Sequence, residues 1–161
     1  MAVIFSAREI AETAVEKEKK RKGFYARVFE LSTQTNMKDL FQFLMEEEGR
    51  HIEAFVQIRD NLQGELHTEE YSADMEAYMD SVVDDRLYSD IDSTEFVQKA
   101  IDTRKVFSLA IGFEKDAILY FREFLPFLTE PDQKIVNQLI EQEKSHIRKL
   151  ADMDKQMAFQ G

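Results

Sequence analysis

Glu48-Gly49-Arg50-His51 and Glu143-Lys144-Ser145-His146 repeat one pattern, a glutamate followed three positions later by a histidine. Three positions on an α-helix correspond to about 300° of rotation, so the two side chains of each pattern share one helix face. A glutamate set among apolar residues precedes each pattern, Glu18 in the first half of the chain and Glu114 in the second. The two lone glutamates lie 96 positions apart and the two histidines 95. The spacing therefore predicts two copies of one helical hairpin.

The two glutamates of each predicted hairpin lie at similar distances from its turn. Glu18 and Glu48 flank the polar stretch 32–36 at a separation of 30 positions, and the second pair flanks 129–132 at a separation of 29. Antiparallel helices that leave a turn symmetrically carry such residues at one height, roughly 20 Å from the turn at about 1.5 Å per residue. Both hairpins should therefore deliver their glutamates and histidines to the same layer.

Helix-forming residues dominate the chain, which contains only 5 Gly and 2 Pro. Apolar residues recur at helical spacing around both patterns, which predicts an all-α four-helix bundle made of two helical hairpins joined by a long crossover. The crossover is expected at residues 63–92, with a short helix inside it. Capping-box frames at Ser6-x-x-Glu9 and Asp92-x-x-Glu95 predict helix starts, and the helix after the second frame is expected to break near 102–103.

Length and composition limit the classes of function. At 161 residues with 13 Phe, the chain is expected to form a single domain over 1–161. The formal charge of −11 is dispersed along the chain, so we expect no nucleic-acid partner. Cysteine is absent, which excludes disulfides, thiolate zinc sites, iron–sulfur clusters and rubredoxin-type iron within this chain. Neither a signal peptide nor an apolar run of the ~20 residues that a membrane span needs is found, so we expect no membrane partner and a cytoplasmic location.

The repeated acids and histidines predict a dinuclear metal site. Four carboxylates and two imidazoles facing one another in an apolar layer would be costly to bury without cations. Oxygen-rich ligation with one nitrogen per ion suits two iron ions, or manganese, and zinc could also occupy it. The predicted metal ligands are Glu18, Glu48, His51, Glu114, Glu143 and His146. The alternative is a bundle with solvated acids and incidental histidines, which a single Glu-x-x-His would favour, but the matched repeat favours the metal site.

Four other polar residues lie near the predicted site or in the crossover. Arg21 and Lys22 follow Glu18 by one helical turn, and we expect both to extend to the surface, the alternative being that one pairs with a ligand carboxylate. Tyr25, about two turns after Glu18, could support the site by a hydrogen bond or as a radical relay, and the simpler interpretation is a core residue. His67 lies in the polar crossover without a matching acid frame and is expected to be a solvated surface residue.

Four segments that together span almost the whole chain resemble a known family. They are Ala14-Val15-x-x-Glu18-Lys19 through Phe24-Tyr25, Glu48-x-x-His51, Ala110-Ile111-x-x-Glu114-Lys115 through Tyr120-Phe121, and Glu143-x-x-His146. This combination resembles the rubrerythrin branch of the ferritin-like superfamily. The resemblance implies a ferritin-like bundle with two iron ions. By the same resemblance, Glu18 and Glu114 would be terminal ligands, Glu48 and Glu143 would bridge, and His51 and His146 would bind one iron each.

Some features depart from rubrerythrins proper. Their Cys-rich rubredoxin module is absent, and the extra glutamate that they carry three residues before or after the third-helix ligand is replaced by Ile111 and Ala117. The site is in this respect more similar to the symmetric centre of bacterioferritins. The haem-binding methionine of bacterioferritins is replaced by Gly49, and no fifth helix is expected. We therefore expect neither haem nor a storage cage.

The resemblance implies a peroxidase or oxidase that reduces hydrogen peroxide or oxygen at a carboxylate-bridged di-iron centre. Because the chain lacks cysteine, its electrons would come from an external donor such as a separate redox protein. A homodimer is expected from the resemblance, and the long crossover would permit exchange of helices between protomers. The alternative is a non-enzymatic protein that binds, handles or senses iron.

Overall fold

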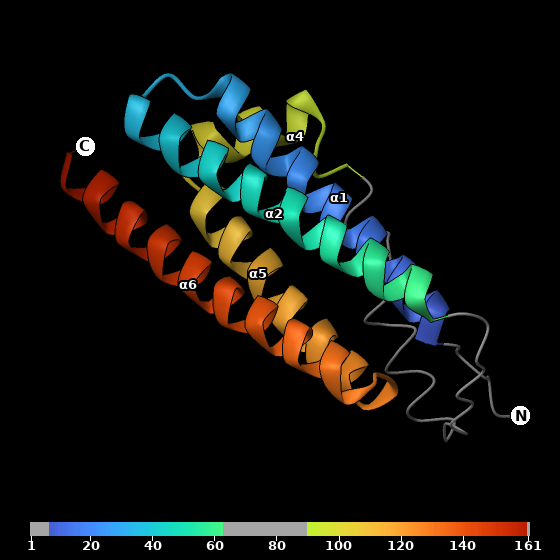
Figure 1. The fold of residues 1–161 in the computed structure, drawn as a ribbon. Coiled ribbons are helices and arrows are strands. Elements are labelled where there is room, and N and C mark those ends of the chain that lie inside the picture. The colour runs from blue at the N-terminus through green and yellow to red at the C-terminus, as the bar shows by residue number, and fades with distance from the viewer. Residues whose placement is uncertain (1–6, 63–89, 161) are drawn as a thin grey trace, which may run out of the picture.

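The structure, a computed structural model, describes residues 7–62 and 90–160, and every regular element in these ranges is helical (Figure 1). The α-helices are α1 (Ala7–Leu31), α2 (Thr35–Asn61), α4 (Thr94–Asp102), α5 (Val106–Phe124) and α6 (Glu130–Gln160), and a short 3-10 helix, η2 (Leu125–Phe127), extends α5. The all-α prediction is confirmed. The predicted cap at Ser6, the predicted short helix of the crossover and His67 lie outside the described residues.

The four long helices form two antiparallel hairpins, α1 with α2 and α5 with α6, which pack against each other as a bundle (Figure 1). The α1–α2 turn lies at the same end of the bundle as the start of α5 and the end of α6, because residues from all of these segments line one cavity there. Consequently α2 and α5 run in the same direction. Two hairpins related in this way need one crossover connection, as predicted from the sequence.

The start of α4 corrects one prediction. The helix begins after Ser93, whose hydroxyl accepts a hydrogen bond from the backbone N–H of Phe96 at 3.2 Å. The predicted cap at Asp92 is therefore one residue too early. The carboxylate of Asp92 lies 3.9 Å from the ammonium of Lys20 on α1 instead. Serine is among the residues that best satisfy the first N–H groups of a helix, so the local chemistry explains the choice.

Two other boundaries follow the predictions closely. The break expected near 102–103 is confirmed, since α4 ends at Asp102 and α5 begins at Val106. Between them Arg104 takes a φ of 56°, in the left-handed region that ends a helix. The first turn, predicted at 32–36, occupies 32–34 because α2 already begins at Thr35.

The bundle core consists of two apolar layers with a polar layer between them. One apolar layer gathers residues from the starts of α1 and α6 and the ends of α2 and α5, including Phe55 and Phe124. The other gathers residues from the opposite ends of these helices and from α4, including Phe41 and Phe107. Both layers exclude water from the residues between them. Within the described ranges, no helix is long and apolar enough to cross a membrane.

Candidate metal centre

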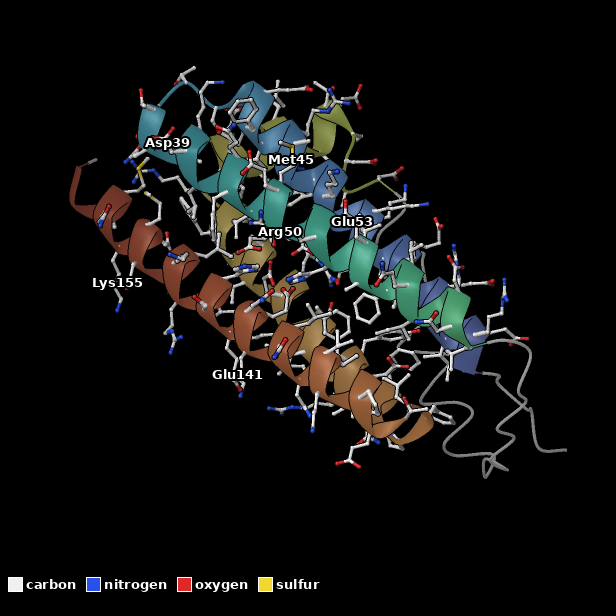
Figure 2. All side chains as sticks on the ribbon, in the orientation of Figure 1. Asp39, Met45, Arg50, Glu53, Glu141 and Lys155 are labelled. Atoms are coloured by element: carbon white, nitrogen blue, oxygen red, sulfur yellow. The ribbon has the colours of Figure 1, made fainter. Side chains whose placement is uncertain are left out.

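The polar layer contains all six residues that the sequence predicts as metal ligands. Every long helix contributes from near its middle: Glu18 on α1, Glu48 and His51 on α2, Glu114 on α5, and Glu143 and His146 on α6. Each of these residues is at most 1% exposed. Other polar residues of the same helices, such as Arg50, Glu53 and Glu141, are exposed on the outside of the bundle (Figure 2). The fold therefore brings both repeats into one layer, as the turn spacing predicted.

Two groups of four ligand atoms, each within 4.8 Å of one another, lie among the described residues. The group that we name the Glu18 position consists of Glu18, Glu48, His51 and Glu143, and the Glu114 position consists of Glu48, Glu114, Glu143 and His146. Each position thus offers three carboxylates and one imidazole, and Glu48 and Glu143 belong to both. Shared carboxylates between two ligand sets are typical of dinuclear centres in helical bundles. Metal binding by these six residues stays a prediction, which the experiments below test.

Most of the potential ligand atoms in this layer have no hydrogen-bond partner. Both carboxylate oxygens of Glu48 and of Glu143 have no hydrogen-bond partner, and the same holds for one oxygen each of Glu18 and Glu114 and for Nδ1 of both histidines. Buried polar atoms without partners are rare in native proteins, and buried carboxylates without partners are especially unfavourable. The set fits metal ions, because a divalent cation would bond to these same oxygen and nitrogen atoms.

His51 is oriented by a residue that the sequence analysis missed. Its Nε2 lies 2.8 Å from Oε1 of Gln142, so the ring donates there and directs Nδ1 toward the carboxylates. That Nδ1 lies 2.6 Å from Oε1 of Glu143. A metal ion bound to both atoms at about 2.0–2.2 Å would require them to lie farther apart than this. Outer hydrogen bonds of this kind fix the ring of a metal-binding histidine. Only the packing of α2 against α6 reveals Gln142, since no spacing rule marks it.

His146 approaches its carboxylates less closely. Its Nδ1 lies 3.6 Å from Oε2 of Glu114 and 3.7 Å from Oε2 of Glu143. Ligand atoms bound to one ion at about 2.0–2.2 Å lie roughly 3–4 Å apart, so these distances suit the Glu114 position to a metal. The ring stacks on that of His51 with centroids 5.8 Å apart, and Phe43 packs edge-on against it at 5.9 Å.

Arg21 does not extend to the surface, which corrects the sequence-based prediction. It is 1% exposed, and its Nη2 donates a hydrogen bond to Oε1 of Glu18. Its Nε lies 3.7 Å from Oε2 of Glu48, and its Nη1 donates to the backbone carbonyl of Phe113 at 3.3 Å. The alternative, pairing with a ligand carboxylate, is therefore correct, because a guanidinium buried between helices needs partners for its charge. Lys22 is exposed, as predicted.

Tyr25 is both a core residue and a partner of the site. It is fully buried, and its hydroxyl donates a hydrogen bond across the bundle to Oε1 of Glu114. The two lone glutamates are thus held alike, because each has one oxygen bonded to a donor on α1 and the other facing the layer. The donor is Arg21 for Glu18 and Tyr25 for Glu114. Both the core interpretation of Tyr25 and the hydrogen-bond interpretation are correct.

Neighbouring groups keep the Glu143 carboxyl ionised. Burial by itself would raise its pKa, but the imidazoles of His146 and His51 and the guanidinium of Arg21 lower that pKa from 4.5 to about 2. Metal ligands must be deprotonated before they bind. At neutral pH a metal ion therefore needs to displace no proton from this carboxyl group.

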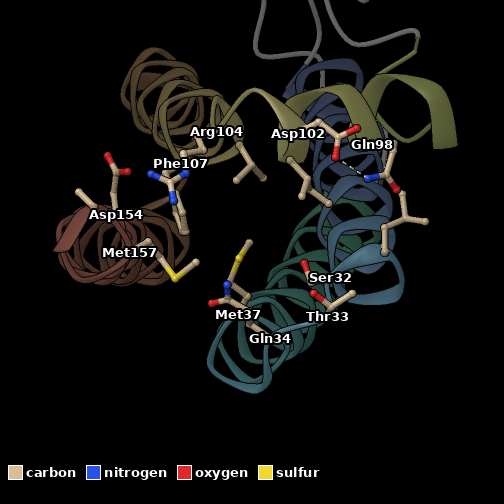
Figure 3. A pocket seen from close by; sticks show the side chains of 14 residues that line it. Ser32, Thr33, Gln34, Met37, Gln98, Asp102, Arg104, Phe107, Asp154 and Met157 are labelled. Carbon is tan, nitrogen blue, oxygen red and sulfur yellow. Dashed lines mark hydrogen bonds between the residues drawn. The ribbon is translucent and has the colours of Figure 1, made fainter. Parts of the chain in front are cut away.

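A separate cavity of about 330 Å³ lies at the end of the bundle that holds the α1–α2 turn (Figure 3). Its lining includes Met37, Phe107, Arg104 and Asp154. None of the six predicted ligands lines this cavity. It is therefore distinct from the candidate metal centre.

Comparison with known proteins establishes the fold. No family model matches the chain, and no curated protein matches it. A solved structure does match, that of a Thermotoga maritima protein provisionally assigned as a ferritin-like diiron-carboxylate protein. The two chains are 24% identical, the match covers 96% of this chain and 98% of the other, and the TM-score is 0.68. Since nearly the whole of both chains superposes, this chain has the ferritin-like four-helix bundle fold.

Proposed function

We propose that this chain is a rubrerythrin-like di-iron oxidoreductase that reduces hydrogen peroxide or oxygen. The observation that carries the proposal is the set of unpartnered ligand atoms on four buried glutamates and two buried histidines. Oxygen-rich ligation with one nitrogen per ion suits iron. The matching structure from Thermotoga maritima, provisionally assigned as a ferritin-like diiron-carboxylate protein, supports the same choice of metals.

The residues of the chain would hold the ions, exclude water and position protons and charge. Two bound ferrous ions would supply two electrons, which together with two protons reduce one hydrogen peroxide molecule to two water molecules. Tyr25 keeps a hydroxyl proton at Oε1 of Glu114, and Arg21 keeps a positive charge beside Glu18. The apolar layers on either side keep bulk water from the six ligands, which strengthens electrostatic interactions within the layer.

The proposal includes the partners of the reaction. Because the sequence has no cysteine, a separate redox protein would deliver electrons to the centre. We further propose that the chain acts as a single domain, in the cytoplasm and as a homodimer.

The decisive experiment is an anaerobic ferrous titration followed by separate additions of oxygen and peroxide, with and without reduced rubredoxin as the donor. We expect binding of two irons per chain and repeated peroxide consumption that is faster than oxygen consumption. Glu114→Ala should abolish turnover, because it removes a ligand from the Glu114 position. Glu141→Ala, which changes an exposed glutamate of α6, is the matched control and should leave turnover unchanged (Figure 2).

A loaded protein that reacts with each oxidant in one stoichiometric event, although the reduced donor is present, would contradict the enzymatic proposal. The non-enzymatic alternative, binding, handling or sensing of iron, would then be the better account.

A further inference from the structure

We infer that Arg21 makes the two metal positions unequal, so that a divalent cation fills the Glu114 position first and the Glu18 position second. The inference rests on the metal-binding part of the proposed function and extends it to the order of loading. In this view Arg21 is an internal cation that competes with metal for Glu18, the carboxylate that belongs to the Glu18 position alone.

Arg21 contacts the unshared carboxylate of one position, Glu18, and the shared carboxylate of Glu48. Its guanidinium donates to Oε1 of Glu18 and lies 3.7 Å from Oε2 of Glu48. Its third contact, with the carbonyl of Phe113 at 3.3 Å, anchors the group to α5. The terminal carboxylate of the other position, Glu114, is instead held by the neutral hydroxyl of Tyr25. A metal entering the Glu18 position therefore meets a resident positive charge at its terminal ligand.

The internal repeat shows that this charge has no counterpart in the second hairpin. The offset of 96 positions that relates Glu18 to Glu114 relates Arg21 to Ala117. Ala117 is buried and apolar. The counterpart of Tyr25 is Phe121, whose ring centroid lies 5.9 Å from the guanidinium carbon of Arg21. The six predicted ligands are repeated in the two hairpins, but the residues around them are not. The difference between the two metal positions therefore comes from the surrounding residues.

The charge balance explains why the position nearer to Arg21 should bind its ion second. Two divalent ions balance the four carboxylates when both imidazoles are neutral, and Arg21 then leaves one excess positive charge in a buried layer. Like charges at close distance in such a medium repel strongly. The first ion is favoured because the layer is still negative, and the ion nearer to Arg21 bears most of the repulsion.

The distances of the two histidines to their carboxylates also favour binding of the first ion at the Glu114 position. At the Glu18 position, Nδ1 of His51 lies only 2.6 Å from Oε1 of Glu143, so a cation must first separate the two atoms. At the Glu114 position, Nδ1 of His146 already lies 3.6 Å and 3.7 Å from its two carboxylates. The Glu114 position is thus closer to the spacing that a bound ion requires.

Manganese(II), added without oxidant, tests the inference by calorimetric titration and electron paramagnetic resonance. The parent protein should bind two ions in two steps. At one equivalent the spectrum should be that of an isolated ion, and coupling between ions should appear only with the second. His146→Ala should weaken the first step by about tenfold or more, whereas His51→Ala should leave the first step nearly unchanged and weaken the second.

Removing the charge of Arg21 should reduce this difference. In an Arg21→Met background, His51→Ala and His146→Ala should weaken the first step more nearly alike than in the parent, and the second step should strengthen by about tenfold or more relative to the parent. Arg21→Gln, which keeps hydrogen-bond donors but no charge, should act in the same way and decides the outcome if Arg21→Met does not fold. Lys22→Met is the matched control, since it removes the same charge from the next, exposed residue and should change neither step.

Equal weakening of the first step by His51→Ala and His146→Ala in the parent protein would overturn the inference, as would a second step that neither Arg21 variant strengthens. Absence of manganese binding would overturn both this inference and the proposed metal centre. Equal positions in a protein that turns over peroxide would remove only the inference. Unequal positions in a protein without turnover would remove only the enzymatic proposal.

Discussion

Glu18 has one oxygen bonded to Arg21 and one facing the polar layer, so its charge affects stability even without metal. We predict that Glu18→Gln lowers the free energy of unfolding of the metal-free protein by about 1–3 kcal/mol, because Arg21 loses its closest charged partner. Relief of repulsion from the other carboxylates acts in the opposite direction, but over longer distances. Urea unfolding under chelation measures the difference.

Glu16→Gln provides the control for this prediction. Glu16 lies on the same helix, is exposed and pairs at 3.5 Å with the exposed Lys19, so the change should cost less than about 0.5 kcal/mol. Equal or greater stability of Glu18→Gln than of the parent would show that repulsion among the carboxylates outweighs the pairing with Arg21.

The lowered pKa of Glu143 predicts that the stability of the protein depends on pH. Its pKa in the folded protein is about 2, below the ordinary 4.5, so the folded state binds this proton less readily than the unfolded state does. The ionised carboxyl therefore contributes stability above about pH 4.5, and this contribution is lost as the pH falls toward 2. In the metal-free protein, the difference in unfolding free energy between the parent and Glu143→Gln should be largest above pH 4.5 and should shrink below it. A difference that grows with acidification would contradict the assigned direction.

At the scale of single elements, α4 depends on its cap. We predict that Ser93→Ala lowers the unfolding free energy by about 1 kcal/mol, because the N–H of Phe96 loses the hydroxyl that accepts its hydrogen bond. Asp92→Ala is the comparison, since the Asp92 carboxylate lies 3.9 Å from the ammonium of Lys20 with both side chains 42% exposed, and the hydrogen bond from Arg27 to the backbone carbonyl of Asp92 does not need the carboxylate. Thermal unfolding measures both changes. A larger loss of stability from Asp92→Ala than from Ser93→Ala would show that Asp92, and not Ser93, caps α4.

At the scale of the whole molecule, metal should couple to folding through all four long helices. The unfolded chain does not assemble the six ligands, so a metal that binds the folded protein stabilises it, by about 2.7 kcal/mol when free metal is at 100 times its dissociation constant. We predict a higher unfolding temperature with manganese(II) for the parent and for Glu53→Ala, which changes an exposed residue of α2. Glu114→Ala should respond less. A parent melting temperature that is indifferent to metal would mean that the six side chains do not bind it together.

Much of this architecture could be predicted because it depends on periodicity. Helical spacing places Glu48 and His51 on one face, and equal distances from the turns bring both hairpins to one height. The cap of α4 was misplaced by one residue because Asp92 and Ser93 are both good caps and only the backbone path chooses between them. Boundaries at single-residue precision depend on such choices.

The sequence by itself determined the all-helical class, the two hairpins, the break between α4 and α5 and the six inward residues, since all of these follow from spacing along the chain. The tertiary structure alone decided that Arg21 turns inward to Glu18, that Tyr25 reaches Glu114 and that Gln142 holds His51. Each of the last two contacts joins helices far apart in sequence, and the burial of Arg21 depends on its partners on α2 and α5. Their partners are set by how the hairpins face each other, which no local period specifies.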